Sequence, residues 1–187
     1  LCEKIGVNIQ DISIGMGLDQ RIGDRFLRAG PAYGGSCFPK DTRALIDVAN
    51  KYKTGLSIIK SVVRSNNQRK ITLSKRIDNI LNNKLKNKII TFLGVTFKPN
   101  TDDMREASSI PMMNYLNKKG SKIRYYDPSG RKKEFDKLKN VKFYSSISSA
   151  CIKSDLIIIH TEWNTFKLLD FKRLVKKKNF KVFDMRN

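Results

Sequence analysis

Residues 33–41 have the sequence YGGSCFPKD, in which a cysteine follows two glycines and precedes an aspartate by four positions. Apolar residues then recur at helical spacing over residues 44–49, and this pattern predicts a helix with Asp41 as its cap or first-turn acid. A thiol near a helix N-terminus is more readily ionised, because the helix dipole is positive there, and the thiolate is the reactive form of cysteine. Gly34 and Gly35 allow positive φ and a close approach of the backbone to a ligand. A single cysteine is more often a small buried residue, so the rest of the chain decides whether Cys37 is a nucleophile.

The regions on either side of this stretch differ in their apolar pattern. Residues 1–84 are predicted to be almost wholly helical apart from the cysteine loop, with the longest helix over residues 56–84, where polar residues 65–70 interrupt the apolar spacing. Over residues 85–187, short apolar runs alternate with helical stretches, which is typical of an α/β domain with a parallel sheet. The predicted strands are residues 89–93, 123–126, 141–144, 156–160 and 181–183. The sequence therefore predicts an α/β fold of two domains, residues 1–84 and residues 85–187.

The composition is strongly basic, with a formal net charge of +21 at pH 7. Such an excess is common in proteins that bind nucleic acids or anionic membranes. The lysines, however, outnumber the arginines and are spread along the chain, and no zinc spacing, RNA-recognition motif or basic zipper is present. We therefore predict a solvated, lysine-rich surface and no nucleic-acid partner, with a basic nucleic-acid-binding protein as the alternative.

The cysteines and the apolar runs bear on cofactors and location. Cys2 and Cys151 show no metal-ligand spacing with Cys37, so we predict no metal site, and three cysteines cannot all pair. Reduced thiols indicate a cytoplasmic protein. No run approaches the ~20 apolar residues of a membrane span, so no membrane partner is predicted. His160, the sole histidine, and Trp163 are predicted to pack or lie on the surface rather than bind a ligand.

Several motifs, taken together, resemble one enzyme family. The string GGSCFPKD at residues 34–41 resembles the catalytic-cysteine signature of the nucleotide-sugar dehydrogenases, the UDP-glucose/GDP-mannose dehydrogenase family. The string GVTFKPNTDDMREA at residues 94–107 resembles the strand-to-helix loop of the family's C-terminal domain. The strings DQRIG at residues 19–23, TEW at 161–163 and DMRN at 184–187 match the family in the same order. The resemblance covers essentially the whole chain, but only the later part of such an enzyme.

The resemblance implies a helical central domain that contributes to a homodimer, followed by a Rossmann-like domain that binds the nucleotide of the sugar substrate. Members of the family begin with a further Rossmann domain whose glycine-rich loop binds NAD, and no Gly-x-Gly-x-x-Gly follows a predicted strand in this chain. Since the chain starts at Leu1 rather than Met, we expect it to lack that NAD-binding domain and to have no turnover by itself. Detectable NAD reduction by the isolated chain would contradict this expectation.

The family's reaction is a four-electron oxidation of the sugar's primary alcohol to a carboxylate, with two NAD. By resemblance, Cys37 would attack the aldehyde formed in the first oxidation, and oxidation of the resulting thiohemiacetal would give a thioester that water cleaves. Asp41, one helical turn beyond Cys37, would orient the water or assist proton transfer. Helix capping is its alternative role.

The other site residues follow from the resemblance, position by position. Arg21 matches an arginine that reaches the substrate of the neighbouring subunit, which implies a homodimer with a shared active site. The implied substrate contacts within the same subunit are Phe26, Arg28, Gly30, Tyr33, Gly34, Phe97, Lys98 and Arg186. The implied cofactor contacts are Lys40 and Arg105.

The sequences around Phe38 and Phe97 resemble the UDP-glucose branch of the family more than the GDP-mannose branch. This resemblance implies UDP-glucose as substrate and UDP-glucuronate as product. GDP-mannose and UDP-N-acetyl-hexosamines stay open as substrates. A function of another class also stays open, namely a non-catalytic module for nucleotide-sugar binding or dimerisation.

Overall fold

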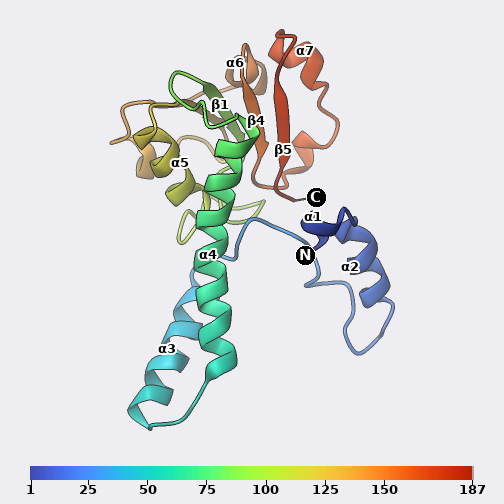
Figure 1. The fold of residues 1–187 in the computed structure, drawn as a ribbon, viewed down its shortest axis with the longest axis vertical. Helices are drawn as coiled ribbons and strands as arrows, with labels where there is room; N and C mark the ends of the chain where they lie inside the picture. Colours follow the sequence, from blue (N-terminus) through green and yellow to red (C-terminus); the bar gives the residue numbers. More distant parts are fainter. Residues whose placement is uncertain (187) are drawn as a thin grey trace.

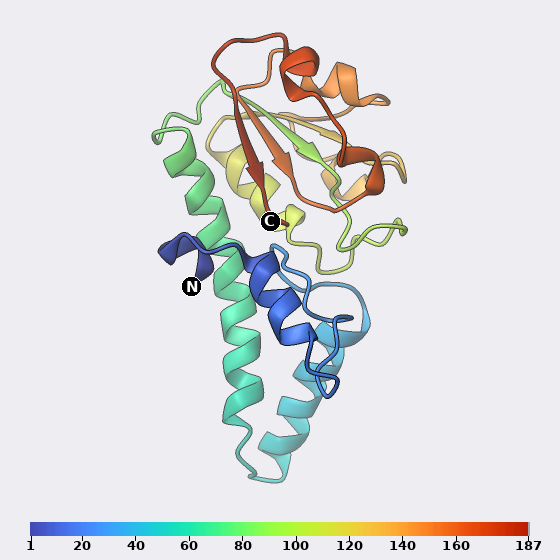
Figure 2. The same ribbon diagram turned by 90° about the vertical axis from the view of Figure 1, so that its right-hand side faces the viewer.

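The computed structural model describes residues 1–186, without the side chain of Glu3. A five-stranded sheet with its flanking helices forms one end of the molecule, and a pair of long helices, α3 (Cys37–Lys51) and α4 (Ser57–Ile80), extends away from it (Figure 1). Two short helices near the N-terminus, α1 (Cys2–Ile5) and α2 (Ile9–Gly17), lie to one side of this pair in Figure 1 and in front of it in Figure 2. A helical region therefore precedes an α/β region, as the sequence predicts.

All neighbouring strands of the sheet are parallel, in the order β3-β2-β1-β4-β5. The strands are β1 (Ile89–Leu93), β2 (Lys122–Tyr126), β3 (Val141–Phe143), β4 (Leu156–Ile159) and β5 (Lys181–Asp184). Each agrees with a predicted strand to within one residue at its ends, so the predicted fold class is confirmed. The chain runs outward from β1 to β3 and then returns to β4 on the other side of β1. The carboxyl ends of β1 and β4 therefore form the switch point at which such sheets bind ligands.

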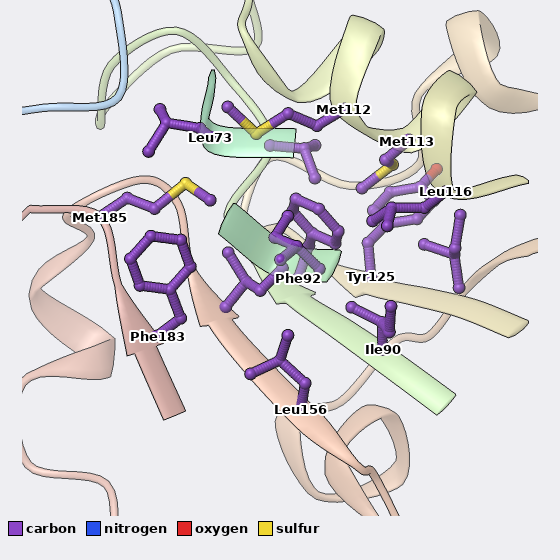
Figure 3. Close-up of a cluster of buried hydrophobic side chains, with 14 of the residues drawn as sticks. Leu73, Ile90, Phe92, Met112, Met113, Leu116, Tyr125, Leu156, Phe183 and Met185 are labelled. Atoms are coloured by element: carbon purple, nitrogen blue, oxygen red, sulfur yellow. The ribbon is translucent and has the colours of Figure 1, made fainter. Parts of the chain in front are cut away.

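The side chains of each strand alternate between two cores, one on each face of the sheet. Phe92 of β1 points to a core that contains Leu73 of α4 and Met112 of α5, as Figure 3 shows. Ile157 of β4 points to the opposite face, where it packs with Val175 of α7. The helices and 3-10 turns around the sheet are α5 (Ser109–Lys118), α6 (Ile147–Cys151), α7 (Phe171–Val175), η1 (Lys133–Phe135) and η2 (Asn164–Phe166). The sheet is the middle layer, with α4 and α5 on one face and α6 and α7 on the other.

The long helix α4 joins the two regions. It runs without a break through the polar residues 65–70 that interrupt its apolar pattern in the sequence. Its last turns bury Leu73 and Ile77 in the core of the sheet, whereas its first turns pack beside α3. The predicted helix over residues 56–84 ends four residues early, because Asn82 and Asn83 adopt left-handed backbone conformations that stop it.

Helix α3 begins at Cys37 itself, whereas the sequence pattern predicts its start near Asp41. Pro39 is its third residue, where a missing N–H costs nothing because the first backbone N–H groups of a helix have no partner within it. Asp41 lies in the second turn and does not cap the helix, so the predicted capping role is wrong. The apolar side chains Leu45 and Val48 lie on the exposed side of α3.

The N-terminal helices bury little. The side chain of Asn8 caps α2 by accepting a hydrogen bond from the backbone N–H of Gln10, and no residue of α2 is buried. Ile14 and Met16 are among its exposed apolar side chains. Among the helices of residues 1–186, none has the length and apolar character needed to cross a bilayer.

Candidate active site

The turn before Cys37, residues 33–36, is called the cysteine turn below. It packs against the loop that follows β1, residues 94–107. The backbone N–H of Gly35 donates to the carbonyl of Arg105 at 2.8 Å, and Gly35 has φ +85°. A Cβ on Gly34 would lie 2.6 Å from the carbonyl oxygen of Glu106, and a Cβ on Gly35 would lie 2.8 Å from the ring of Phe97. Only glycine fits at these two positions, so two of the strings that carry the family resemblance, residues 34–41 and 94–107, meet directly in the structure.

Asn66 of α4, which is not among the predicted site residues, anchors this turn. Its side-chain amide donates to the carbonyl of Tyr33 at 3.1 Å and accepts from the N–H of Tyr33 at 2.9 Å. The ring of Tyr33 packs edge-on against Phe38, with 4.7 Å between the ring centroids. Asn66 is half-buried, and Lys70, one helical turn beyond it, is buried and pairs with Glu106. The signal in the sequence is a polar pair at i and i+4 inside an otherwise apolar helix face, which requires partners once it is buried.

The thiol of Cys37 is exposed and has charged neighbours. Its Sγ lies 3.5 Å from Oγ of Ser36. Arg105 forms a short ion pair with Asp103, at 2.8 Å, and this pair raises the pKa of the guanidinium, with a smaller contribution from the negative charge of a Cys37 thiolate. On α3, the carboxylate of Asp41 is 3.4 Å from the ammonium of Lys40, and both are exposed. The predicted residues Cys37, Asp41 and Lys40 therefore share the first turns of α3.

A cavity of about 570 Å³ lies between the N-terminal segment and the carboxyl ends of β4 and β5. This volume falls in the range of small-molecule sites. Its charged lining residues are Asp24, Arg28, Glu162, Lys167, Asp184 and Arg186. Trp163 forms part of its wall and packs against the core on the α6 and α7 face of the sheet, as the sequence predicts for this residue.

Arg186 fixes one end of this cavity. Its guanidinium donates to the carbonyl of His160 at 2.9 Å and lies 2.9 Å from the carboxylate of Glu162. Burial lowers the pKa of Arg186, and the charges of Glu162 and Asp184 oppose that shift. A Cβ on Gly30 would lie 2.7 Å from Nη1 of Arg186, so the backbone of residue 30 rests on the guanidinium. The predicted residues Arg28 and Arg186 thus line one cavity, and Gly30 lies against Arg186 at its edge.

Other predicted residues lie outside these two groups. Arg21 is almost fully exposed and pairs with Asp19 at 2.6 Å, and the side chain of Phe26 is 96% exposed. Neither lines the cavity. The ammonium of Lys98 lies 5.4 Å from the ring centroid of Phe97, at the start of the loop that contacts the cysteine turn.

Asp127 stands where a dinucleotide-binding sheet places its ribose-binding acid, at the carboxyl end of β2. It is buried, and its carboxylate accepts from the backbone N–H groups of Val95 and Ser129. Because these donors occupy the carboxylate, Asp127 closes the loop after β1 rather than facing a ligand. The described sheet therefore does not present the dinucleotide-binding arrangement, and the predicted cofactor contacts Lys40 and Arg105 lie on the exposed side, near Cys37.

His160 is fully buried at the end of β4, in a hydrogen-bonded chain. The hydroxyl of Thr161 donates to the carbonyl of Thr96 at 2.7 Å, so it accepts from Nδ1 of His160 at 3.0 Å. Nε2 then accepts from the hydroxyl of Ser108 at 2.8 Å. Burial lowers the pKa of His160 to about 3. The imidazole is therefore neutral at physiological pH, and the prediction that His160 packs is confirmed.

We expect His160 to make the protein less stable in mild acid. The unfolded chain protonates its histidine below about pH 6.5, whereas the folded chain does not until about pH 3. The free energy of unfolding therefore decreases as the pH is lowered from about 6.5 to about 3. Between pH 7.5 and pH 5 the loss is about 2 kcal/mol, from the 1.4 kcal/mol that each pH unit contributes once the unfolded histidine titrates. Urea unfolding at several pH values measures it. The variant His160→Asn should lose most of this slope, and equal slopes in both proteins would contradict the expectation.

Comparison with known proteins gives matches over both regions. The model of the UDP-glucose/GDP-mannose dehydrogenase family, UDP binding domain, matches residues 91–187, and the model of the same family's central domain matches residues 1–68. The UDP-glucose 6-dehydrogenase of Rhizobium meliloti (strain 1021) is 40% identical over 188 aligned residues, which cover 100% of this chain and 43% of that protein. The chain thus spans less than half the length of this relative.

Solved structures give the same result. A UDP-glucose dehydrogenase from the archaeon Pyrobaculum islandicum superimposes with a TM-score of 0.86 at 30% identity, over 98% of this chain and 41% of that one. A GDP-mannose dehydrogenase from Pseudomonas aeruginosa superimposes with a TM-score of 0.70 at 25% identity, over 98% of this chain and 43% of that one. The fold described above therefore corresponds to a continuous part of these larger enzymes.

Proposed function

The chain belongs to the UDP-glucose/GDP-mannose dehydrogenase family, and from this membership we propose that it carries the reactive thiol and the nucleotide cavity of an NAD-dependent oxidation of UDP-glucose to UDP-glucuronate. The observation that carries the proposal is the contact between the Gly34-Gly35 turn and residues 105–106, which supports Cys37 as a residue held for chemistry. The identity of 40% to the Rhizobium meliloti UDP-glucose 6-dehydrogenase favours UDP-glucose among the substrates that the family name covers. We also propose the predicted division into domains at residues 84 and 85.

The thiol is required because the reaction removes four electrons in two steps. The first oxidation takes a hydride and a proton from the primary alcohol and leaves an aldehyde. The sulfur of Cys37 then adds to the aldehyde carbon and the oxygen takes up a proton, which gives a thiohemiacetal that cannot diffuse away. The second oxidation removes a hydride and a proton from the thiohemiacetal and leaves a thioester. Water adds to the thioester, and the carbon–sulfur bond breaks to give the carboxylate and the free thiol.

Asp41 and the nearby cations serve these steps. The carboxylate of Asp41 is exposed one turn from Cys37 and would accept a proton from the attacking water. Lys40 and Arg105 are exposed cations near the thiol and would bind the diphosphate of NAD. NAD supplies the hydride acceptor for both oxidations when it is bound there.

The cavity that Arg28 and Arg186 line would hold the nucleotide. Both guanidiniums can donate paired hydrogen bonds to phosphate oxygens. Gly30 lets the backbone approach Arg186 closely, and Phe97 and Lys98 would extend the substrate site from the cavity toward Cys37. Tyr33 and Gly34 would continue it along the cysteine turn.

We further propose a homodimer in which Arg21 reaches the site of the partner subunit. Arg21 and Phe26 are exposed on the loop between α2 and α3 and contact no part of their own cavity. Exposed apolar side chains on α2 and α3, such as Ile14 and Val48, would be buried in such an assembly. Size-exclusion chromatography with light scattering measures the mass directly.

The nucleotide site predicts a difference between two neighbouring arginines. We expect Arg28→Ala to weaken UDP binding to the 187-residue chain about tenfold, because a charge-assisted hydrogen bond to phosphate is lost. Arg25→Ala is the matched control, since Arg25 is exposed on the same loop but does not line the cavity. Isothermal titration calorimetry measures both affinities. Equal affinities in the two variants would contradict the proposed site.

The same titration separates the alternatives. Tighter binding of GDP than of UDP would favour the GDP-mannose reaction. Tight UDP binding without any oxidation of UDP-glucose by the complete enzyme would leave UDP-N-acetyl-hexosamines or a non-catalytic binding module.

A further inference from the structure

The carboxylate of Glu106 connects two helices to the loop after β1. Its Oε1 accepts from the guanidinium of Arg43 on α3 at 2.5 Å, and its Oε2 lies 3.3 Å from the ammonium of Lys70 on α4. The side chain of Lys70 is only 11% exposed. Arg43 chiefly, and Lys70 to a smaller extent, lower the pKa of Glu106, so the carboxylate stays ionised at neutral pH.

The backbone of Glu106 takes part in the same contact. Residue 106 has φ +55°, a left-handed conformation that is unfavourable for a side chain other than glycine. The two ion pairs compensate for this strain. Because of this conformation, the carbonyl oxygen of Glu106 lies against Gly34, while the preceding carbonyl of Arg105 accepts from Gly35. One residue thus contacts the cysteine turn with its backbone and both long helices with its side chain.

We propose that Glu106 is a positioning residue for the thiol of Cys37. By pairing with Arg43 in the second turn of α3 and with Lys70 on α4, it holds the start of α3 against residues 94–107. The carbonyl of Arg105 in that loop accepts from Gly35, two residues before Cys37, so this contact keeps the thiol near Arg105. This inference rests on the proposed function, because it concerns the group that we assign as the nucleophile. Glu106 itself touches neither substrate nor the reacting sulfur.

A positioning role and a simple charge effect predict opposite results. Glu106 is a negative charge near the cysteine turn, so its removal alone would make the surroundings of the thiol more positive. If Glu106 instead holds the thiol next to Arg105, its loss separates the two groups and makes the surroundings of the thiol less positive. A reagent that reports the local charge at Cys37 therefore distinguishes the two effects.

The experiment compares the alkylation of Cys37 by iodoacetate, which is negatively charged, and by iodoacetamide, which is neutral. Peptide mapping by mass spectrometry gives the rate at Cys37 in the 187-residue chain at neutral pH. The ratio of the two rates reports the local positive charge and cancels the amount of thiolate. An unpaired positive charge moved away from about 6 Å in water would lower the ratio about threefold, and because Asp103 pairs with Arg105 and moves with it, we expect a smaller fall of about 1.5-fold. The buried Cys151 in the same sample should stay unmodified while the protein is folded.

Glu106→Asp is the deciding variant, because it keeps the charge but shortens the side chain, so that it cannot reach both helices. We expect its ratio to fall about 1.5-fold, by the same Coulomb argument for the paired Arg105. An unchanged or higher ratio would overturn the proposal. Alkylation of the buried Cys151 would show that this variant is unfolded, and Glu106→Gln then takes its place. A lower ratio is again the expected result, since loss of the charge alone would raise the ratio. Glu134→Gln, at an exposed residue of η1, is the matched control and should leave the ratio unchanged.

Failure of this inference and failure of the proposed function give different results. The alkylation ratio needs no substrate and no NAD. A lowered ratio together with an enzyme that oxidises no nucleotide sugar would leave the positioning role in place and reject the reaction. An unchanged ratio in an enzyme that oxidises UDP-glucose would reject the positioning role alone.

Discussion

Replacing Cys37 with serine should lower the steady-state rate of NADH formation from UDP-glucose by more than about a thousandfold, the scale of effect expected when a catalytic nucleophile is removed. The thiol forms the covalent bond that carries the aldehyde into the second oxidation, and a serine hydroxyl is a much weaker nucleophile at neutral pH. The measurement uses a chimera in which this chain replaces the matching 43% of the Rhizobium meliloti enzyme, so that the rest of the enzyme is supplied. Absorbance at the NADH band gives the rate.

Cys2→Ser is the control for this variant. Cys2 lies on α1 and is also unpaired, but it takes no part in the proposed site. The control chimera should turn over at the unmodified rate. Steady turnover by the Cys37→Ser chimera at a rate near that of the control would reject the covalent mechanism.

The second large effect concerns Gly94, at the end of β1. It has φ +74°, and a Cβ there would lie 2.5 Å from Cβ of Thr161, which is buried in the chain of hydrogen bonds to His160. We expect Gly94→Ala to lower the free energy of unfolding by about 2 to 4 kcal/mol, from the left-handed backbone together with overpacking. Urea unfolding measures this loss.

Gly130→Ala separates the two causes. Gly130 has φ +88°, but a Cβ there would meet nothing within 4 Å. This variant should therefore lose only about 1 kcal/mol, from the backbone conformation alone. Equal losses in both variants would show that the close approach between Gly94 and Thr161 does not limit packing.

The strands were predictable because a parallel sheet buried on both faces requires continuous apolar runs. Residues 156–159 read Leu-Ile-Ile-Ile and form β4, with side chains in both cores. Such runs are short, lie between polar turns and are rich in β-branched residues, and these three features favour a strand over a buried helix segment. The loop after β1 and the cysteine turn carry sequence motifs that resemble the family, and the structure places the two in contact.

The start of α3 and the links between helices were not predictable from spacing. Cys37, Phe38 and Pro39 carry no helical apolar pattern, yet they form the first turn of α3. Asn66 and Glu106 act through partners more than thirty residues away in the chain. The sequence shows that such polar residues exist, but only the packing of α4 beside α3 decides which of them meet.

The ratio of NADH formed to UDP-glucose consumed by the chimera tests the central claim most directly. The account predicts two NADH for each UDP-glucuronate, with no free aldehyde released, because the thiohemiacetal on Cys37 passes into the second oxidation. One NADH per sugar, with an aldehyde product that a carbonyl reagent traps, would contradict the claim that Cys37 carries the intermediate.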